Sequence, residues 1–127
     1  MSTVPERRIV FNEEAIVAYG GSGAGIHSEI EAANAAGFPA LVSWGTATML
    51  PFWEILEQIA GEHWLIGGSV AVRLKKPVCA GDEVHYFGQQ VAAADSRRTI
   101  ELVAETARHG VVATVLANLP RIDVPQP

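Results

Sequence analysis

The residue whose type and setting best fit acid and base chemistry is His27. It lies in the segment 20–28, which reads GGSGAGIHS and has glycine or alanine at five of its nine positions. Such a segment predicts a flexible loop that a ligand can approach closely, and an imidazole titrates near neutral pH. The hydroxyl groups of Ser22 and Ser28 are its neighbours in sequence. We therefore expect His27 to be a functional residue, at a place in the loop where a ligand can enter.

No other pattern in the chain indicates a metal, a nucleotide or a nucleophile. The histidines His63, His85 and His109 lack the spacing of metal ligands, and we interpret them as structural or solvated. The glycine-rich loop follows a helix pattern and contains no Gly-Lys-Ser/Thr, which argues against a dinucleotide or phosphate loop. Gly-Ser-Gly at 21–23 does not leave a strand, as a nucleophile elbow would. The sequence thus predicts no metal and no cofactor.

A long apolar helix is predicted from Trp44 to Ala60. Apolar residues recur in it at three- and four-residue spacing, and Gly61 is a usual helix stop. The apolar stripe is wide, which is typical of a helix that other elements surround. Pro51 removes one backbone hydrogen bond and is expected to kink the helix. The first turn, Ser43 to Thr46, has free backbone amides, which favour a negative or developing negative oxygen.

The elements that position these residues are predicted from shorter patterns. Asn12 and Ser28 are expected to cap two short helices, the second with Glu31 in a capping box. After residue 64 the apolar period changes to two, which predicts strands, with Gly67-Gly68 as a weak or bulged point in the first of them. One long apolar helix with five antiparallel strands predicts an α+β fold in which the sheet curls around the helix. The expected strands are Arg7–Phe11, a long one over the run 65–78 that Pro77 ends, Glu83–Ala93, Arg98–Arg108 and Val111–Leu119.

Composition argues against several classes of function. The chain has 127 residues, for which we expect one domain spanning 1–127. A net charge of -5 without a basic run argues against nucleic acid as a partner. No stretch of about 18 apolar residues is present, so we expect no membrane span, and the polar start predicts no signal peptide. The single cysteine, Cys79, fits a reducing compartment, and we expect a cytoplasmic protein.

Three local motifs follow one another along the chain. Tyr19, Ser22-Gly23 and Ile26-His27 precede an acidic helix that ends in glycine, SEIEAANAAG. An apolar lead-in then reaches a glycine at the start of the long helix, in ALVSWGTATM, and a strand runs into KKPVCAGDEV. In their order and spacing these motifs resemble the MaoC-like branch, or R-specific enoyl-CoA hydratases, of the hotdog-fold superfamily.

The resemblance implies a single hotdog domain, a five-stranded antiparallel sheet wrapped around a central helix, which forms a dimer or a higher oligomer. Such proteins bind acyl thioesters of coenzyme A or acyl carrier protein between subunits and add or remove water at a 2-enoyl group in fatty acid metabolism. The family's histidine matches His27, and the backbone amide that polarises the thioester carbonyl matches Gly45. This sequence departs from the family twice: Ala24 stands where the loop normally has Asp, and Trp44 stands where His is common.

Three hypotheses follow from this resemblance and its gaps. The first is a hydratase or dehydratase, with His27 as general acid and base, assisted by Ser22 or Glu29, and the Gly45 amide as oxyanion donor. The second is a non-catalytic acyl-binding subunit of a heteromeric hotdog complex, which the missing Asp favours. The third is a hotdog thioesterase, which needs a carboxylate to activate water, whereas Glu54 and Glu57 come late in the helix.

Substrate contacts are expected around the start of the long helix. The aromatic side chains there would form a pocket for a bulky or flat acyl group. The residues expected to bind substrate are Ser43, Trp44, Thr46, Phe52 and Trp53.

Overall fold

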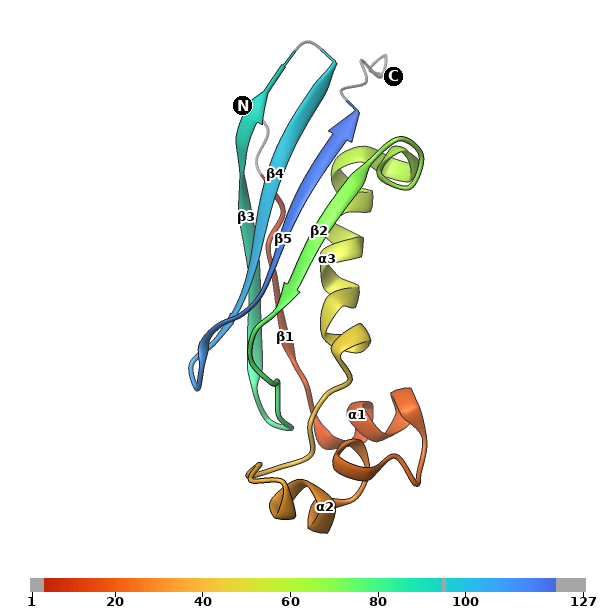
Figure 1. Cartoon of the computed structure of the whole chain (residues 1–127), viewed down its shortest axis with the longest axis vertical. Coiled ribbons are helices and arrows are strands. Elements are labelled where there is room, and N and C mark those ends of the chain that lie inside the picture. Colours follow the sequence, from red (N-terminus) through yellow and green to blue (C-terminus); the bar gives the residue numbers. More distant parts are fainter. Residues whose placement is uncertain (1–3, 95, 121–127) are drawn as a thin grey trace.

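The computed structural model describes residues 4–94 and 96–120 of the chain (Figure 1). In the described part of the chain all helices lie before residue 65, and every strand except β1 lies after it. In chain order the elements are β1 (Arg7–Val10), α1 (Glu13–Gly20), the 3-10 helix η1 (Gly25–His27), α2 (Ile30–Ala35), α3 (Gly45–Ala60), the 3-10 helix η2 (Gly61–Trp64), β2 (Ser69–Leu74), β3 (Glu83–Ala93), β4 (Arg97–Thr106) and β5 (Gly110–Pro120).

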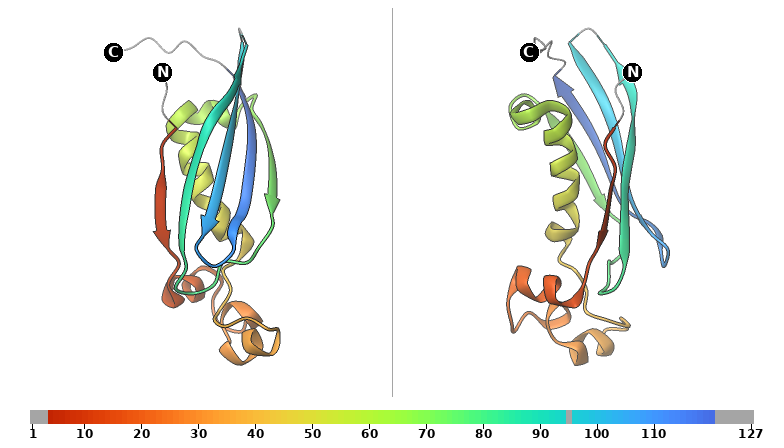
Figure 2. Two further views of the ribbon diagram at one scale, coloured as in Figure 1. Left: turned by 90° about the vertical axis from the view of Figure 1, so that its left-hand side faces the viewer. Right: turned by 180° about the vertical axis from the view of Figure 1, so that it is seen from behind.

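The strands form one antiparallel sheet in the order β1-β3-β4-β5-β2. Strands β3, β4 and β5 are the central three, and β1 and β2 are the edges (Figure 2). Side chains of a strand alternate between the two faces of a sheet, so buried positions recur at every second residue of β4. This sheet, together with the long helix beside it, confirms the predicted α+β fold.

Helix α3 lies along one face of the sheet (Figures 1 and 2). Phe52, Ile55 and Leu56 on its inner side are fully buried. Phe52 meets Tyr86 of β3 edge to face, with ring centroids 5.1 Å apart. Burying a large apolar side chain contributes about 1.5–3 kcal/mol to the free energy of unfolding, so the layer between α3 and the sheet is the main source of stability.

The short helices α1, η1 and α2 lie beyond the N-terminal end of α3, outside the sheet (Figure 1). Ile16 of α1, Ala33 of α2 and Leu41 of the following segment are buried and attach this part of the chain to the core. As a result, the glycine-rich loop lies beside the first turn of α3.

Most of the predicted helix boundaries are confirmed. Asn12 caps α1, because its side-chain oxygen accepts a hydrogen bond from the Ala15 amide at 2.7 Å. Helix α3 begins at Gly45 and ends before Gly61, which has a φ of +56° that favours glycine. Pro51 is a buried residue inside the helix. In the described part of the chain, no helix combines the length and hydrophobicity needed to cross a bilayer.

The predicted Ser28 cap is wrong. Helix α2 begins one residue later than such a cap requires, with Glu29 at the cap position and no side-chain capping bond. The Ser28 hydroxyl instead accepts a hydrogen bond from the Ala24 amide at 2.7 Å. The hydroxyl therefore closes the glycine-rich loop, and this local bond competes with capping.

The first long strand is shorter than predicted. Residues 61–64 form η2, and β2 begins only at Ser69. Gly67 has a φ of +84°, and a Cβ at Gly68 would lie 2.4 Å from the Trp64 carbonyl oxygen, so the chain turns back there. The two glycines thus precede the strand and do not interrupt it. The other four strands are confirmed, with ends that differ by at most two residues.

Candidate active site

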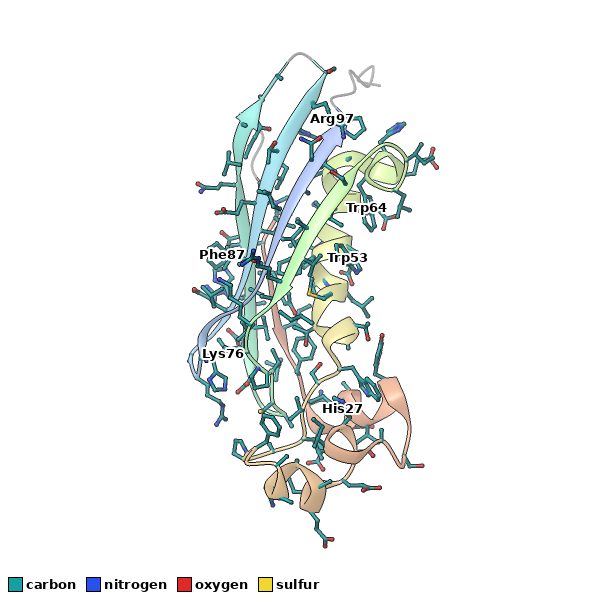
Figure 3. All side chains as sticks on the ribbon, in the orientation of Figure 1. His27, Trp53, Trp64, Lys76, Phe87 and Arg97 are labelled. Atoms are coloured by element: carbon teal, nitrogen blue, oxygen red, sulfur yellow. The ribbon has the colours of Figure 1, made fainter. Side chains whose placement is uncertain are left out.

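Three segments meet at the N-terminal end of α3: the loop 20–28, the extended segment 41–44 and the first turn of the helix. Figure 3 shows His27 at this junction, below α3 and beside α1. Val42 links two of the segments, because its amide donates a hydrogen bond to the Ile26 carbonyl at 3.0 Å. The fold thus brings together His27, Ser43, Trp44, Gly45 and Thr46 of the predicted site.

The His27 imidazole is held in one orientation by main chain and by stacking. Its Nδ1 lies 2.6 Å from the carbonyl oxygen of Val42. A carbonyl oxygen only accepts hydrogen bonds, so Nδ1 carries a proton and donates it, and Nε2 of the neutral ring keeps its lone pair. The ring also stacks on Trp44, with centroids 4.0 Å apart and planes 19° from parallel. This arrangement leaves Nε2 as the atom that can take up a proton.

The loop around His27 has a shape that only glycine readily adopts. Gly21, Gly23 and Gly25 all have positive φ, between +60° and +79°. The bond from the Ala24 amide to Ser28 closes the loop, and Ser22 is exposed on it. No side-chain partner for the Ser22 hydroxyl occurs in the described residues, so this hydroxyl is open to solvent or to a ligand.

Trp44 occupies the position expected for a family histidine, and it packs against the end of α1. A Cβ at Gly20 would lie 2.2 Å from the indole Nε1, so the ring lies directly on the Gly20 backbone. The indole nitrogen is buried and has no hydrogen-bond partner in the described part of the chain. Beside it, the Tyr19 hydroxyl donates to the Thr46 hydroxyl at 2.9 Å. Both contacts tie the end of α1 to the start of α3.

The first turn of α3 keeps free amides. No side chain caps the helix at Trp44, and the amides of Gly45, Thr46 and Ala47 have no hydrogen-bond partner within residues 4–94 and 96–120. The helix dipole adds positive potential at this end. Such amides stabilise an oxygen on which negative charge develops.

Two buried hydroxyl groups lie under this first turn. The Thr48 hydroxyl donates to Ser43 Oγ at 3.1 Å, and Ser43 Oγ donates to the Trp44 carbonyl at 3.2 Å. The Tyr86 hydroxyl reaches from the sheet to the Thr48 carbonyl at 2.7 Å. Burial is the main cause that raises the pKa of Tyr86, and the negative charge of Glu54 is the second. These bonds fix the start of α3 on the sheet.

Two hollows flank the first turn of α3. One, of about 290 Å³, lies towards β2. Its lining includes Ser43, Gly45, Leu74, Lys75 and Lys76. The other, of about 240 Å³, lies between α1, β1 and α3 and is mostly apolar. Its lining includes Phe11, Tyr19, Trp44, Leu50 and Pro51. The free amides and a hollow for an apolar group are therefore neighbours.

Two larger hollows lie away from His27. One, of about 340 Å³, is at the C-terminal end of α3, where Arg98 donates to the Ile59 carbonyl at 3.0 Å. The other, of about 500 Å³, lies beside the start of β3. Its arginines are paired, Arg108 with Asp82 at 3.2 Å and Arg8 with Glu83 at 3.4 Å. In both hollows the arginines already bond to the protein, whereas the first turn of α3 keeps amides without partners in the described residues, so we place the candidate site at the start of α3.

Two predicted substrate-binding residues lie outside this group. Phe52 is fully buried in the core. Trp53 stacks on Trp64 with centroids 5.4 Å apart, towards the other end of α3 (Figure 3). The sequence interpretation also missed contributors to the site: the Val42 carbonyl, Gly20 beneath Trp44, and the Tyr19 hydroxyl. A main-chain carbonyl leaves no signal in a sequence.

In the described part of the chain, neither Cys79 nor a metal-binding cluster offers a second centre. Cys79 is a free, buried cysteine. Burial is the main cause that raises the pKa of the Cys79 thiol, and the negative charge of Asp82 is the second. The thiol therefore stays protonated at neutral pH. Among the described residues, no group of three or more histidine, cysteine, aspartate or glutamate side chains could hold a metal ion.

Comparison with known proteins rests on structure alone. No protein-family model and no curated protein sequence matches the chain. The structure is similar to a chain of the ChsH1–ChsH2 complex from Mycobacterium tuberculosis, with a TM-score of 0.79 and 20% identity over 95% of this chain and 96% of that one.

Two further solved structures have the same architecture. The MaoC-like dehydratase from Rhodospirillum rubrum gives a TM-score of 0.76 at 21% identity, over 99% of this chain and 96% of that one. The (R)-hydratase of A. caviae involved in PHA biosynthesis gives a TM-score of 0.70 at 19% identity, over 93% of this chain and 95% of that one. At these identities the likeness shows the fold, and the chain has the hotdog fold of the MaoC-like dehydratases and R-hydratases.

Proposed function

We propose that this chain is a hydratase or dehydratase that adds water to a 2-enoyl thioester, or removes it, with coenzyme A or acyl carrier protein as the carrier. The observation that carries the proposal is the oriented imidazole of His27. Its Nδ1 is engaged by the Val42 carbonyl at 2.6 Å, which leaves Nε2 for proton transfer, and the ring stacks on Trp44, the residue that precedes the free amides of α3. The shared fold with hydratases and dehydratases supports the same reaction class.

In the proposed mechanism the thioester carbonyl oxygen accepts a hydrogen bond from the Gly45 amide. His27 Nε2 takes a proton from water while the water oxygen bonds to C3 of the enoyl group. The electron pair of the double bond moves towards the carbonyl, and the enolate oxygen is stabilised by the amide and the helix dipole. His27 then returns its proton to C2. Water is thus added as a hydroxyl at C3 and a hydrogen at C2, and dehydration is the reverse.

The water in this mechanism needs a second hydrogen-bonding group, because Ala24 stands where the family has a carboxylate. Ser28 is already bonded to the Ala24 amide. Ser22 is exposed on the same loop and has no partner in the described residues. We therefore assign it the role of orienting the water, and its replacement by alanine is expected to lower kcat.

We assign the acyl group to the apolar hollow beside α1. Trp44 and Ser43 contribute to its wall, and Thr46 is bonded to Tyr19, which also lines it. We assign Ser43 and Thr46 to the entry of the thioester. A hollow of about 240 Å³ holds a group of limited size. Trp53 stays in the proposal as a contact for a longer acyl group, and Phe52 has no surface left for one.

A second copy of the chain is the proposed partner. All six residues of the edge strand β2 are exposed. Val70, Val72 and Leu74 share its α3 side and are 38–54% exposed, and an open apolar edge favours pairing with another chain. Light scattering should give a dimer of the 13.5 kDa chain or a larger oligomer. A monomer at micromolar concentration would contradict this.

The test of the reaction is hydration of crotonyl-CoA and of a bulkier aromatic enoyl-CoA. His27→Ala is expected to lower kcat by about a hundredfold or more. His109→Ala is the matched control, because His109 is exposed in the turn between β4 and β5. Equal activity of the two variants would remove His27 from the mechanism.

A second candidate is a non-catalytic subunit of a heteromeric complex, which the missing loop carboxylate favours. It predicts that the pure chain hydrates neither substrate, and that His27→Ala leaves a partner's activity unchanged when the two proteins are mixed. Hydration by the pure chain would exclude this candidate.

A further inference from the structure

The carbonyl that holds His27 belongs to a segment that is itself held from the far side. Residues 41–43 pair with the turn before β3: the Ser43 amide donates to the Val78 carbonyl at 2.8 Å, and the Ala80 amide donates to the Leu41 carbonyl at 2.7 Å. Between them, Val42 and Cys79 form an isolated antiparallel bridge. The position of the Val42 oxygen therefore depends on the turn 79–82.

That turn is organised by one buried carboxylate. Asp82 accepts the Cys79 amide on Oδ2 at 2.9 Å and the Arg108 Nε on Oδ1 at 3.2 Å. Its side chain is only 7% exposed, whereas that of Arg108 is 43% exposed. A buried carboxylate stays in place only while its oxygens are bonded. Arg108, from the turn between β4 and β5, supplies the compensating charge.

The same turn also holds the helix on the other side of the loop. The Phe11 amide donates to the Asp82 carbonyl at 2.9 Å, and the Gly81 amide donates to the Phe11 carbonyl at 2.8 Å. Phe11 immediately precedes the Asn12 cap of α1. Helix α1 ends at Gly20, on which Trp44 lies. Both contacts of the His27 ring, the carbonyl and the indole, thus lead back to Asp82.

We propose that Asp82 and Arg108 are positioning residues for His27, acting through the turn 79–82 and the Val42 carbonyl. This inference rests on the proposed function for its effect on turnover. The claim that Asp82 and Arg108 fix the orientation of His27 does not depend on the proposed function, because that orientation is a property of the free protein. Without Arg108, the buried Asp82 carboxylate must draw in water, the turn loosens, and the Val42 oxygen moves away from Nδ1.

The experiment compares Arg108→Gln with Arg8→Gln. Arg8 forms a similar pair with Glu83, next to Asp82 in sequence, with N and O 3.4 Å apart, but that pair is exposed and does not contact the segment 41–43. Two readouts need no substrate: hydrogen exchange of the Ser43 amide, and the ¹⁵N and ¹H signals of the His27 imidazole, which report the tautomer and the Nδ1–H bond. Hydration of crotonyl-CoA is the third.

Arg108→Gln is expected to speed Ser43 exchange about tenfold and to shift or broaden the Nδ1–H signal. It should lower kcat about tenfold while KM changes by less than about twofold, since a loosely held base loses rate and not affinity. Arg108→Lys should recover part of each effect, and Arg8→Gln should show none. Asp82→Asn, which keeps an acceptor for the Cys79 amide, should resemble Arg108→Gln if it folds.

Unchanged exchange and an unchanged imidazole signal in Arg108→Gln would overturn the proposal, as would equal effects of Arg8→Gln. If the wild-type chain hydrates no substrate, the proposed function fails, but exchange and imidazole signals still decide whether Asp82 positions His27.

Discussion

The two ends of helix α3 are held in different ways. At the C-terminal end the protein supplies contacts of its own: Gly61 turns the chain, and Trp53 stacks on Trp64. Arg98 donates to the Ile59 carbonyl, while its buried Nε has no partner in the described residues. At the N-terminal end no side chain caps the helix, and the first amides have no partner in the described residues.

The difference indicates where function resides. An exposed or half-buried helix end without a cap is less stable by about 1 kcal/mol than a capped one. The N-terminal end has no cap and therefore lacks this stabilisation, and a hollow lies on each side of it. We infer that the C-terminal end serves stability and the N-terminal end serves binding, and substitutions at each end test this division.

Among the variants that test this division, the largest effect is expected for Gly20→Ala. Its Cβ would lie 2.2 Å from the Trp44 Nε1, so the indole must move and His27 loses its stacking partner. Misplacing a reacting group by about 1 Å costs roughly a hundredfold in rate, and we expect a loss of that size in hydration of crotonyl-CoA. The midpoint of urea unfolding should change little, because the clash is at the edge of the core.

Two variants frame the result for Gly20. Ala18→Ser changes an exposed residue of the same helix and should keep full activity. Adding Trp44→Phe to Gly20→Ala should recover part of the activity, because the smaller ring leaves room for the methyl group. Full activity of Gly20→Ala alone would show that the Trp44 position does not matter.

Trp64→Ala tests the opposite end. Trp53 and Trp64 are half-buried and stacked, with ring centroids 5.4 Å apart. Loss of the Trp64 ring and of this stack should lower the free energy of unfolding by about 2 kcal/mol. The rate per folded molecule should stay unchanged, and Leu65→Ala, at a residue that is 68% exposed, should alter neither quantity. A raised KM in Trp64→Ala would assign this end of the helix to the acyl site.

Gly45→Ala addresses the free amide itself. A Cβ there would lie 2.7 Å from Leu74 Cδ1, which is the mobile end of a side chain and can move aside. Stability should therefore change by less than about 1 kcal/mol, since alanine also favours the helix. The displaced Leu74 narrows the hollow towards β2, which borders Gly45, whose amide is the proposed contact of the thioester carbonyl. We therefore expect kcat/KM to fall about tenfold.

A double-mutant cycle separates the two causes in Gly45→Ala. If Leu74 blocks the hollow, Gly45→Ala with Leu74→Ala should be more active than Gly45→Ala alone. Strictly additive losses would mean that the methyl group, and not Leu74, disturbs the oxyanion contact.

The scaffold could be predicted from the sequence because periodicity reports it. The three- and four-residue spacing in α3 and the alternation in β3, β4 and β5 reflect burial on one face, which every residue of an element shares. The start of β2 could not be predicted, since a period of two continues through Gly67 and Gly68 although the chain turns there.

The site could be predicted only in part, for a different reason. The setting of His27 and the first turn of α3 are visible in the sequence, but the contacts that orient the ring involve the Val42 carbonyl and Gly20, whose identities carry no chemical signal. The apolar pattern of α3 also predicts Phe52 and Trp53 as substrate contacts, but it does not report how far along the helix they lie from the free amide. Seven and eight residues from Gly45, at about 1.5 Å per residue, they are about 10–12 Å along the helix from the free amide.

The smallest effect is expected for Tyr86→Phe, which removes a hydrogen bond between the sheet and the N-terminal part of α3. Tyr86 donates to the Thr48 carbonyl at 2.7 Å, and Tyr86→Phe should lower the free energy of unfolding at neutral pH by about 1 kcal/mol. Burial raises the pKa of Tyr86 above its ordinary value of 10.0. Above that pH the unfolded chain releases this proton while the folded chain keeps it, so wild-type stability falls as pH rises.

Tyr86→Phe cannot lose this proton, so the difference between variant and wild type should narrow above pH 10 in urea unfolding measured along a pH series. The pKa of Cys79 is also raised by burial, from 9.0, so both proteins should still lose some stability there, and Cys79→Ala in each background removes that part. A constant difference at every pH would mean that Tyr86 ionises as readily in the folded chain as in the unfolded one. The hydroxyl would then be open to solvent, and the first turn of α3 would not be fixed on the sheet as firmly as its C-terminal end.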